Sequence, residues 1–475
     1  MAQAQSIVNE AVKQFLAGKP VTEGFVLEVD GERYHCEQIL RWLPGRRLVI
    51  KALHHGEPLL LKLFAPNKKG WRELSREQHG YKVCKAAGVA VPTEKLISDD
   101  FAGCLAVAYE FIADACPFEL LSNNQAQMVP ALLQLMVRCH QAGIYQHDIH
   151  TDNILMTPHG LLLIDLASVR GLAGQSLSTR KSLSNLARLV AQFVPDQQQL
   201  ILKKLNLYYQ ARGWTYGQAE RENFKTLLNK AWQKRKETYL SKCFRACTMT
   251  AYFKDKHLEY ALKRSFFKQI GKQAVRDLDV LVERGKRLKD GNSATVVMTE
   301  MAGRKVVIKR YNIKSYWHFL KRCWRPSRAA NAWRQGNLLH FLGIPTPEVL
   351  GFVEHRLGPL RKEAYLITEY VAGAREVSEV YKERSPAAVE FKQIQLIFSL
   401  MLEYHLSHGD LKASNLLLSE TGDIELIDLD VMREHRYSWV FRRAFNKDMK
   451  RFLRNWHGEV LRMRFNSMIE NLTQK

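Results

Sequence analysis

Apolar positions along the chain follow two spacings. The opening residues MAQAQSIVNEAVKQFLAG place Ile7, Val8, Val12, Phe15 and Leu16 at helical intervals, which predicts an amphipathic helix that packs on the following domain rather than inserting into a membrane. Short apolar runs such as EPLLLKLF, RKVVIKRY, AVAYEFI and YLITEYV predict buried strands. These opening residues lack the basic start and the unbroken apolar core that characterise a secretory signal peptide. No run approaches the roughly 18 apolar residues of a membrane span, so we expect any membrane contact to be peripheral.

An internal repeat stands out within this pattern. Residues 140–170 read HQAGIYQHDIHTDNILMTPHGLLLIDLASVR, and residues 405–433 read HLSHGDLKASNLLLSETGDIELIDLDVMR. Each copy has an Asp, an Asn five residues later, an apolar run, a turn signal and a second apolar run ending in Asp-Leu. The matched residues are Asp148, Asn153 and Asp165 in the first copy and Asp410, Asn415 and Asp428 in the second. Their offsets of 262, 262 and 263 residues indicate a tandem duplication.

The repeated unit predicts phosphoryl-transfer chemistry. Its three oxygen-bearing side chains fall on loops at strand ends. The first Asp can accept or orient a hydroxyl proton, and the Asn and the later Asp can hold a hard cation such as Mg²⁺. Together they would place a metal-bound phosphate against an acceptor oxygen. A single copy would be equally typical of an Asx-rich hairpin turn, and the matched second copy favours the chemical interpretation.

A lysine lies in an apolar strand upstream of each copy, Lys62 in the first half and Lys309 in the second. A buried ammonium needs an anionic partner, so we expect a phosphate or a carboxylate beside each one. In the first half, either Glu73 or Glu77 on the following predicted helix is placed to pair with the lysine. The second half has no acid between Lys309 and Pro347, which leaves Asp428 or phosphate itself as the partner.

Length and composition indicate a globular chain of two or three domains, with 475 residues, 46% of them hydrophobic and 25% charged. The net charge is +23, and residues 230–276, 309–334 and 432–456 account for +10, +8 and +6 of it. Most such runs form solvated helix faces, but Trp and Phe interleaved with these cations also suit a lipid–water interface or stacking on sugars or bases. We therefore expect an acidic partner. The eight scattered cysteines predict reduced thiols, without a zinc site at Cys243 and Cys247.

These residues resemble the protein-kinase superfamily. The resemblance implies that Lys62 and Lys309 bind ATP phosphates and that Glu77 or Glu73 orients the first of them. It assigns the catalytic aspartates to Asp148 and Asp410, with Lys412 beside the second, and the magnesium ligands to Asn153, Asp165, Asn415 and Asp428. Glu110 and Glu369 end the strands where an adenine-binding connector would lie. Asp-Leu-Ala and Asp-Leu-Asp stand where regulated kinases have Asp-Phe-Gly, and no Ala-Pro-Glu is recognisable, which argues against a eukaryotic-type regulated kinase.

Within that superfamily the chain resembles the bacterial lipopolysaccharide core kinases of the Kdo/WaaP type, over about residues 25–205 and 280–445. The features that carry this are HGDLKASNLLL with IDLD, the helix PSRAANAWRQGNLLHFLGIPTP, and the basic-aromatic tail after Asp428. The family implies magnesium-dependent transfer from ATP to a heptose or Kdo hydroxyl of lipopolysaccharide core or a lipid-linked acidic glycan. It also implies a cytoplasmic protein, peripheral on an anionic inner-membrane surface. Because no nucleic-acid motif accompanies the charge, no nucleic-acid partner is expected.

The predicted fold class is α+β, with two tandem protein-kinase-like folds, each a small β-rich lobe followed by a mainly helical lobe. The expected divisions are an N-terminal helical extension over 1–24, a first kinase-like domain over 25–245, a basic linker over 246–276 and a second kinase-like domain over 277–475. Either half or both could be active, and two active sites are favoured because neither half lacks an Asp or Asn. The alternatives are a pseudokinase scaffold for core assembly and a kinase for a soluble small molecule or protein.

Overall fold

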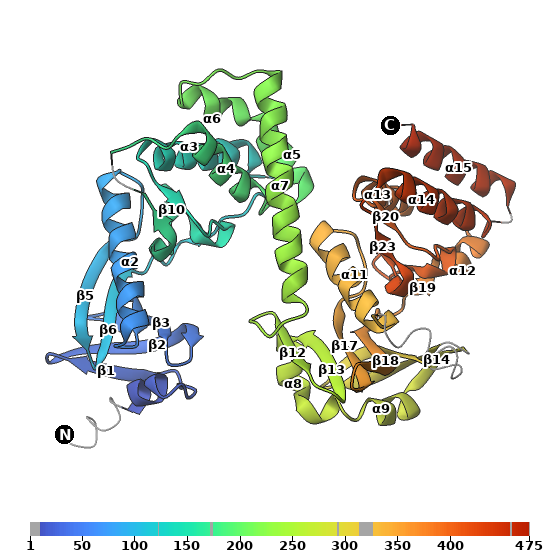
Figure 1. Cartoon of the computed structure of the whole chain (residues 1–475), viewed down its shortest axis with the longest axis horizontal. Coiled ribbons are helices and arrows are strands. Elements are labelled where there is room, and N and C mark those ends of the chain that lie inside the picture. The colour runs from blue at the N-terminus through green and yellow to red at the C-terminus, as the bar shows by residue number, and fades with distance from the viewer. Residues whose placement is uncertain are drawn as a thin grey trace. The chain divides into compact units, whose positions relative to one another are not determined.

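The computed structural model describes residues 10–121, 123–171, 174–291, 294–312, 326–456 and 458–474. The chain divides into two compact units, Met1–Arg235 and Lys236–Lys475 (Figure 1). The boundary falls inside the long helix α7, Gln218–Lys242.

The first unit begins with a six-stranded antiparallel sheet in the order β1-β2-β3-β4-β6-β5. Its strands are β1 (Phe25–Val29), β2 (Glu32–Leu43), β3 (Arg47–His54), β4 (Glu57–Phe64), β5 (Glu94–Phe101) and β6 (Cys104–Glu110). Residues 10–16 are helical, and their Val12 and Phe15 lie in the apolar core on one face of this sheet. The predicted amphipathic helix therefore packs on the domain that follows it. Ile7 and Val8 lie outside the described residues.

Helix α2 (Lys68–Ala86) packs against β4 and β6, and the rest of the first unit is mainly helical. The helices that follow are α3 (Gln125–Gln141), α4 (Thr179–Val190), α5 (Pro195–Lys203), α6 (Leu205–Ala211) and α7. Between α3 and α4 lie short strands, namely β8 (Tyr145–Gln146), β9 (Ile154–Thr157), β10 (Gly160–Leu163) and β11 (Val169–Arg170). Strand β7 (Cys116–Pro117) pairs with β9. This strand-rich segment holds the first copy of the repeat.

The second unit begins with a seven-stranded sheet in the order β12-β13-β17-β18-β16-β15-β14. Its strands are β12 (Thr250–Lys254), β13 (Leu258–Lys263), β14 (Lys286–Gly291), β15 (Ala294–Met301), β16 (Arg304–Tyr311), β17 (Val349–Leu357) and β18 (Leu360–Glu369). Alternate residues serve opposite faces, since Tyr365 and Ile367 pack with α8 (Arg264–Ala274) and α9 (Leu278–Arg284), whereas Leu366 packs with α11 (Arg328–Leu342). The sheet is thus covered by helices on both sides (Figure 1).

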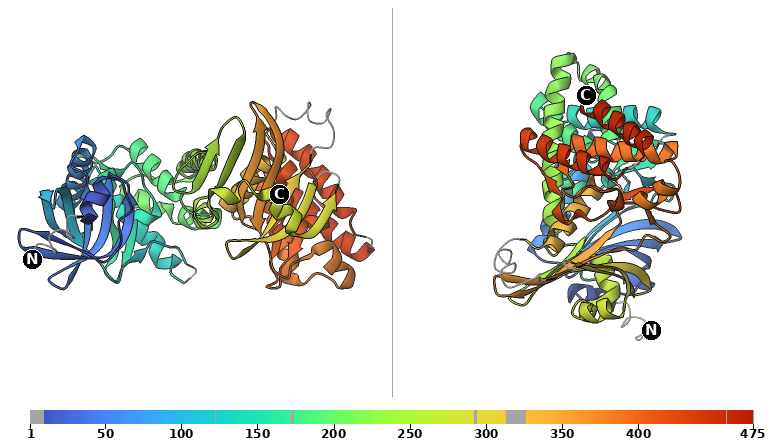
Figure 2. Two further views of the ribbon diagram at one scale, coloured as in Figure 1. Left: turned by 90° about the horizontal axis from the view of Figure 1, so that it is seen from below. Right: turned by 90° about the vertical axis from the view of Figure 1, so that its right-hand side faces the viewer.

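The remainder of the second unit is again mainly helical, and its orange and red helices lie beside the yellow-to-orange sheet (Figure 2). The helices are α12 (Val377–Glu383), α13 (Ala388–Glu403), α14 (Ser438–Leu453) and α15 (Glu459–Thr473). The short strands of the second repeat copy are β20 (Leu406–Ser407), β21 (Leu416–Leu418), β22 (Ile424–Leu426) and β23 (Arg433–Glu434). Strand β19 (Arg375–Glu376) pairs with β21, as β7 pairs with β9 in the first unit.

Five strands of the two sheets share one order. The sequence β2-β3-β4-β6-β5 in the first unit corresponds to β14-β15-β16-β18-β17 in the second. Lys62 lies on β4 opposite Val107 of β6, and Lys309 lies on β16 opposite Leu366 of β18, so both lysines occupy the same place in that order. The mixed helix and sheet content agrees with the α+β prediction, and a tandem duplication remains a prediction to which this shared order adds support.

The expected basic linker over residues 246–276 is wrong. Strand β13 pairs with β17 along five residues, and Phe266 of α8 is buried in the core of the second sheet. The alternation of apolar residues in this segment therefore builds the second unit instead of joining two domains. The first unit correspondingly ends at Arg235, ten residues before the expected boundary.

The basic-aromatic stretch over residues 432–456 has two faces. Phe441, Phe445 and Phe452 of α14 are buried, so they belong to the core, whereas Tyr437 and Trp439 are exposed. Half of the stretch over 309–334, namely residues 313–325, lies outside the described residues. Among the helices that the structure describes, none is both long enough and apolar enough to cross a bilayer.

Candidate active site

The two repeat copies adopt the same local geometry. The side-chain amide of Asn153 donates to the carbonyl of Asp148 at 3.0 Å, and that of Asn415 donates to the carbonyl of Asp410 at 2.8 Å. Each Asn thereby closes its own loop and leaves its side-chain oxygen available. Asp165 and Asp428 both have left-handed backbone, with φ of 56° and 63°. Because this conformation is uncommon outside glycine, its occurrence at both matched aspartates marks a turn that the two copies share.

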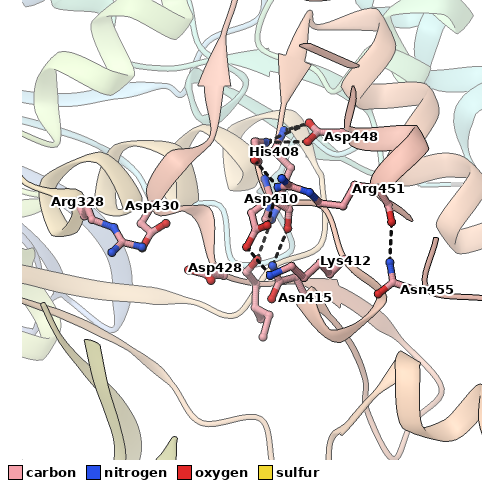
Figure 3. Close-up of polar contacts among 12 residues, drawn as sticks. Arg328, His408, Asp410, Lys412, Asn415, Asp428, Asp430, Asp448, Arg451 and Asn455 are labelled. Atoms are coloured by element: carbon pink, nitrogen blue, oxygen red, sulfur yellow. Dashed lines mark hydrogen bonds and ion pairs between the residues drawn. The ribbon is translucent and has the colours of Figure 1, made fainter. Parts of the chain in front are cut away.

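Asp410 is held between two cations in the second unit (Figure 3). Its Oδ1 accepts a hydrogen bond from Arg451 Nη1 at 2.6 Å, and its Oδ2 lies 3.0 Å from Lys412 Nζ. Arg451 also donates to the carbonyl of Gly409 at 2.9 Å, which fixes the guanidinium to the loop. The Asp410 side chain remains 32% exposed, so it can still meet a substrate hydroxyl.

A buried carboxylate on helix α14 anchors the same loop. Asp448 on α14 is 2% exposed, and it accepts the backbone N–H groups of His408 at 2.7 Å and Gly409 at 3.0 Å (Figure 3). The His408 ring in turn donates from Nε2 to the carbonyl of Ile427 at 2.9 Å. The residues that precede Asp410 are therefore tied both to a helix and to the strand that leads to Asp428.

Lys309 contacts two carboxylates. Its Nζ pairs with Asp428 and lies 3.2 Å from Asp430 Oδ2, while Arg328 of α11 lies 2.5 Å from the same Asp430 oxygen. The Asp430 side chain is only 2% exposed. The carboxylate expected on a helix in the first half is thus supplied here by the residue two positions after Asp428. The sequence-based alternative that Asp428 itself partners Lys309 also holds.

The charges in this cluster affect Asp428 and Asp430 in opposite directions. Burial raises the pKa of Asp428, but the adjacent Lys309 ammonium outweighs it and leaves that pKa below its ordinary value. Burial raises the pKa of Asp430 above its ordinary value, and Lys309 and Arg328 offset this only in part. Two cations and two carboxylates nearly balance, so a metal ion and phosphate could enter together without a large net charge change.

Lys62 has a different partner in the first unit. Its ammonium pairs with Glu77 on α2, whose side chain is fully buried and also accepts the N–H of Ala167 at 3.1 Å. Glu73, the other candidate, instead contacts Arg46 at 2.5 Å. Ala167 occupies the position that corresponds to Asp430. Each unit therefore supplies its lysine with a carboxylate, from a helix in the first unit and from the turn in the second.

Asp148 is less constrained than Asp410. Its side chain is 74% exposed and its Oδ1 lies 3.0 Å from His150 Nε2. No carboxylate takes the anchoring role of Asp448 among the described residues of the first unit. Asn185 of α4 donates there to the carbonyl of Gln146 at 2.8 Å and accepts from His140 Nε2 at 3.1 Å. The residues before Asp148 are thus held by hydrogen bonds of the Asn185 amide, without a buried carboxylate in the part of the unit that the structure describes.

The remaining predicted residues lie at strand ends. Glu110 ends β6 and its backbone N–H donates to the carbonyl of Thr93 at 2.8 Å. Glu369 ends β18, its N–H donates to the carbonyl of Glu348 at 2.8 Å, and its side chain lies 3.0 Å from Arg304. Both glutamates are therefore placed where the sheet leads into the helical part of each unit, and their role toward a nucleotide remains a prediction.

The donor set of the second unit fits a divalent cation. Asn415 and Asp428 present an amide oxygen and a carboxylate, which are ligands that Mg²⁺ accepts in proteins. Lys309 lies beside Asp428 and can hold a phosphate oxygen, and Asp410 lies on the loop that Asn415 closes. This arrangement has the parts that phosphoryl transfer requires, namely a cation site, a phosphate ligand and a residue for the acceptor hydroxyl.

The sequence by itself assigned no role to four residues of the second site: Arg328, Asp430, Asp448 and Arg451. Asp430 was visible as the last residue of IDLD. Asp448 had a stronger signal, since it shares a helical face with Phe441, Phe445 and Phe452, and an acid on an apolar face needs buried donors. No sequence signal singled out Arg451, because it is one of several cations in the basic tail.

One comparison with known proteins matches a segment of the second unit. Residues 278–470 match the model of the lipopolysaccharide kinase (Kdo/WaaP) family. A comparison with curated proteins finds no match. Among solved structures, the chain described as "WaaP in complex with acyl carrier protein" is similar at 20% identity and a TM-score of 0.34, over 45% of this chain and 90% of that chain. The family match covers the segment that carries Asp410, Asn415 and Asp428, and it identifies the chain as an enzyme of the kinase class.

Proposed function

We propose that this chain transfers the γ-phosphoryl group of ATP to a sugar hydroxyl, heptose or Kdo, of lipopolysaccharide core, and that the second unit carries the reaction. The observation that supports this most is the coincidence of the family match with one assembled site. Asp410, Asn415 and Asp428 share that site with a lysine held by two carboxylates.

In this proposal Asp410 orients the acceptor hydroxyl and takes its proton as the hydroxyl oxygen bonds to the γ-phosphorus, while the bond from that phosphorus to the bridging oxygen breaks and ADP leaves. Arg451 and Lys412 keep the Asp410 carboxylate on its loop, and Lys412 is placed to share the charge of the transferred phosphoryl group. Asn415 and Asp428 would hold Mg²⁺, which when bound neutralises phosphate charge and aligns the nucleotide. Lys309 would move from Asp428 to a phosphate oxygen, while Asp430 continues to hold its ammonium.

The first unit retains a comparable set in Lys62, Glu77, Asp148, Asn153 and Asp165. We propose that it binds nucleotide through Lys62 and that transfer does not depend on it. The support is that Asp148 is largely exposed on a loop without a carboxylate anchor, whereas Asp410 is held by two cations on an anchored loop. Activity in both halves, the interpretation favoured from the sequence, is the alternative that the experiment below distinguishes.

We further propose that the protein acts at the inner face of the cytoplasmic membrane, where lipid-linked core and ATP meet. The exposed Tyr437 and Trp439 and the exposed Arg442 and Arg443 follow Asp428 closely in the chain. Cations near an anionic surface contribute about 1 kcal/mol each, and aromatic side chains suit the headgroup region. Co-sedimentation with anionic vesicles should weaken as salt is added.

The test is ATP-dependent phosphorylation of purified lipopolysaccharide core by the full chain and by single variants. Asp410→Asn should abolish transfer, whereas Asp148→Asn should leave most of it. Asp423→Asn, an exposed turn residue 13 positions after Asp410, is the matched control and should behave as wild type. Undiminished transfer by Asp410→Asn would refute the assignment to the second unit.

A pseudokinase scaffold is the second candidate. It is favoured by the ion pairs of Lys309 with Asp428 and Asp430, which compete with a phosphate for the Lys309 ammonium. A thermal shift with ATP, with and without Mg²⁺, separates the two. Absence of any shift, together with absence of transfer to core, would favour the scaffold. A shift without transfer to core would instead point to another acceptor, such as a soluble small molecule or a protein.

A further inference from the structure

One cluster of metal-ligating side chains lies apart from the kinase residues, in the sheet of the first unit. Glu32, His54 and His55 each offer one ligand atom, and these atoms all lie within 4.8 Å of one another. The Nε2 atoms of both histidines point to the same oxygen, Glu32 Oε2, at 3.2 Å for His54 and 2.7 Å for His55. Two imidazoles and a carboxylate thus converge on one point.

The strand pairing fixes two of these ligands. Glu32 begins β2 and His54 ends β3, and the pairing of the two strands starts at His35 and Leu53, the neighbours of Tyr34 and His54. The rings of Tyr34 and His54 stack at a centroid distance of 4.3 Å and an interplanar angle of 6°. Glu32 and Tyr34 are two residues apart on one strand, so their side chains leave the same face. The stacked imidazole is therefore held beside the carboxylate.

The third ligand is set by the turn that follows. His55 has φ of 51° and Gly56 has φ of 81°, so both central residues of the β3–β4 turn are left-handed. This turn brings the His55 ring to 4.2 Å from the His54 ring. A left-handed histidine costs free energy that Asn or Gly at the same place would avoid. Arg33, the cation next to Glu32 on β2, has its Nε 3.8 Å from Glu28 Oε2. It therefore pairs with Glu28, whereas Glu32 contacts the two histidines.

From this geometry we propose that Glu32, His54 and His55 form a binding site for a borderline transition-metal ion, with Zn²⁺ as the expected occupant. Imidazole nitrogen and carboxylate oxygen are common zinc ligands, whereas Mg²⁺ prefers all-oxygen sites. His55 is 71% exposed and Glu32 is 48% exposed, so water or a further ligand can complete a four-coordinate shell. The site shares no residue with the proposed kinase centres and does not rest on the proposed function.

The test is isothermal titration of metal-free full-length chain with ZnCl₂, comparing wild type with Glu32→Gln and His55→Ala. Removing even an outer-shell partner of a ligand weakens metal binding by about 10–100-fold, so each variant should bind Zn²⁺ at this site at least ~10-fold more weakly. His35→Ala is the matched control, because His35 is exposed on the same strand three residues from Glu32, and it should bind as wild type. Circular dichroism confirms that each variant is folded.

Superimposable titrations of wild type and His55→Ala would overturn the proposal and would leave an ordinary His–carboxylate contact. An equal loss in His35→Ala would also overturn it, because binding would then be distributed over surface histidines. Asp410→Asn should bind Zn²⁺ as wild type does. Failure of the kinase assignment and failure of the zinc site are thus separately visible.

Discussion

The contact between Asp448 and the loop before Asp410 offers a quantitative prediction. In Asp448→Ala the N–H groups of His408 and Gly409 lose a charged acceptor at 2.7 and 3.0 Å. A hydrogen bond to a charged group contributes about 1.5–3 kcal/mol. The N–H of Gly409 can regain water because Gly409 is exposed, whereas that of His408 stays buried. We therefore expect the second unit to lose about 2–4 kcal/mol of its free energy of unfolding.

The assay is urea unfolding of the full chain, followed by a probe that reports the second unit. Asp448→Asn keeps one acceptor oxygen, so its loss should be smaller than that of the alanine variant. Asn446→Ala, an exposed residue on the same helix, should cost no more than ~0.5 kcal/mol. A loss in Asp448→Ala no larger than this control would refute the view that Asp448 holds the loop. Transfer should fall with the loop, because Asp410 follows these two residues directly.

Three further predictions concern the lysine partners and one buried histidine. Glu77→Gln should destabilise the first unit by about 3–5 kcal/mol in urea unfolding, because Lys62 would lose its buried partner. Asp430→Asn should weaken Mg·ATP binding by the second unit roughly tenfold in titration calorimetry, or about 1.4 kcal/mol, because Lys309 would lose the carboxylate that holds its ammonium while it contacts the phosphate. Burial lowers the pKa of His140 from its ordinary 6.5 to about 4. The unfolded imidazole therefore binds a proton first as pH falls, and the first unit should lose roughly 3 kcal/mol between about pH 7 and pH 4. His140→Gln should flatten that pH dependence, and an unchanged slope would contradict the assignment.

Local sequence was sufficient for the chemistry-bearing loops. Asp410, Asn415 and Asp428 lie within 19 residues of each other, and the strand, turn and strand between them follow from short-range apolar patterning. The same reasoning located Lys62 and Lys309 on strands, because β-forming neighbours surround each one. It also limited the partner of Lys62 to two glutamates on one helix.

The sequence misassigned elements whose identity depends on distant neighbours. Residues 250–263 were predicted to belong to a basic linker. They form strands instead, because β13 pairs with β17, which lies about ninety residues later in the chain. The aromatic residues of the basic tail were predicted to lie together on the protein surface. Helix periodicity instead places three phenylalanines of α14 on the buried face of the helix. Propensity and charge do not show which partner strand or face a segment will meet.

The sequence by itself determined that the chain carries two matched Asp, Asn and Asp sets, each preceded by a strand lysine, because that information is contained in short spacings. Only the tertiary structure decided how each set is supported. Glu77 serves Lys62 from a helix, whereas Asp430 and Arg328 surround Lys309, since helix α11 brings a cation and no acid to that place. Asp448 and Arg451 reach the Asp410 loop from about 40 residues away, and Glu32 meets His54 and His55 across paired strands. These contacts arise from packing between segments far apart in the chain, and no local pattern specifies them.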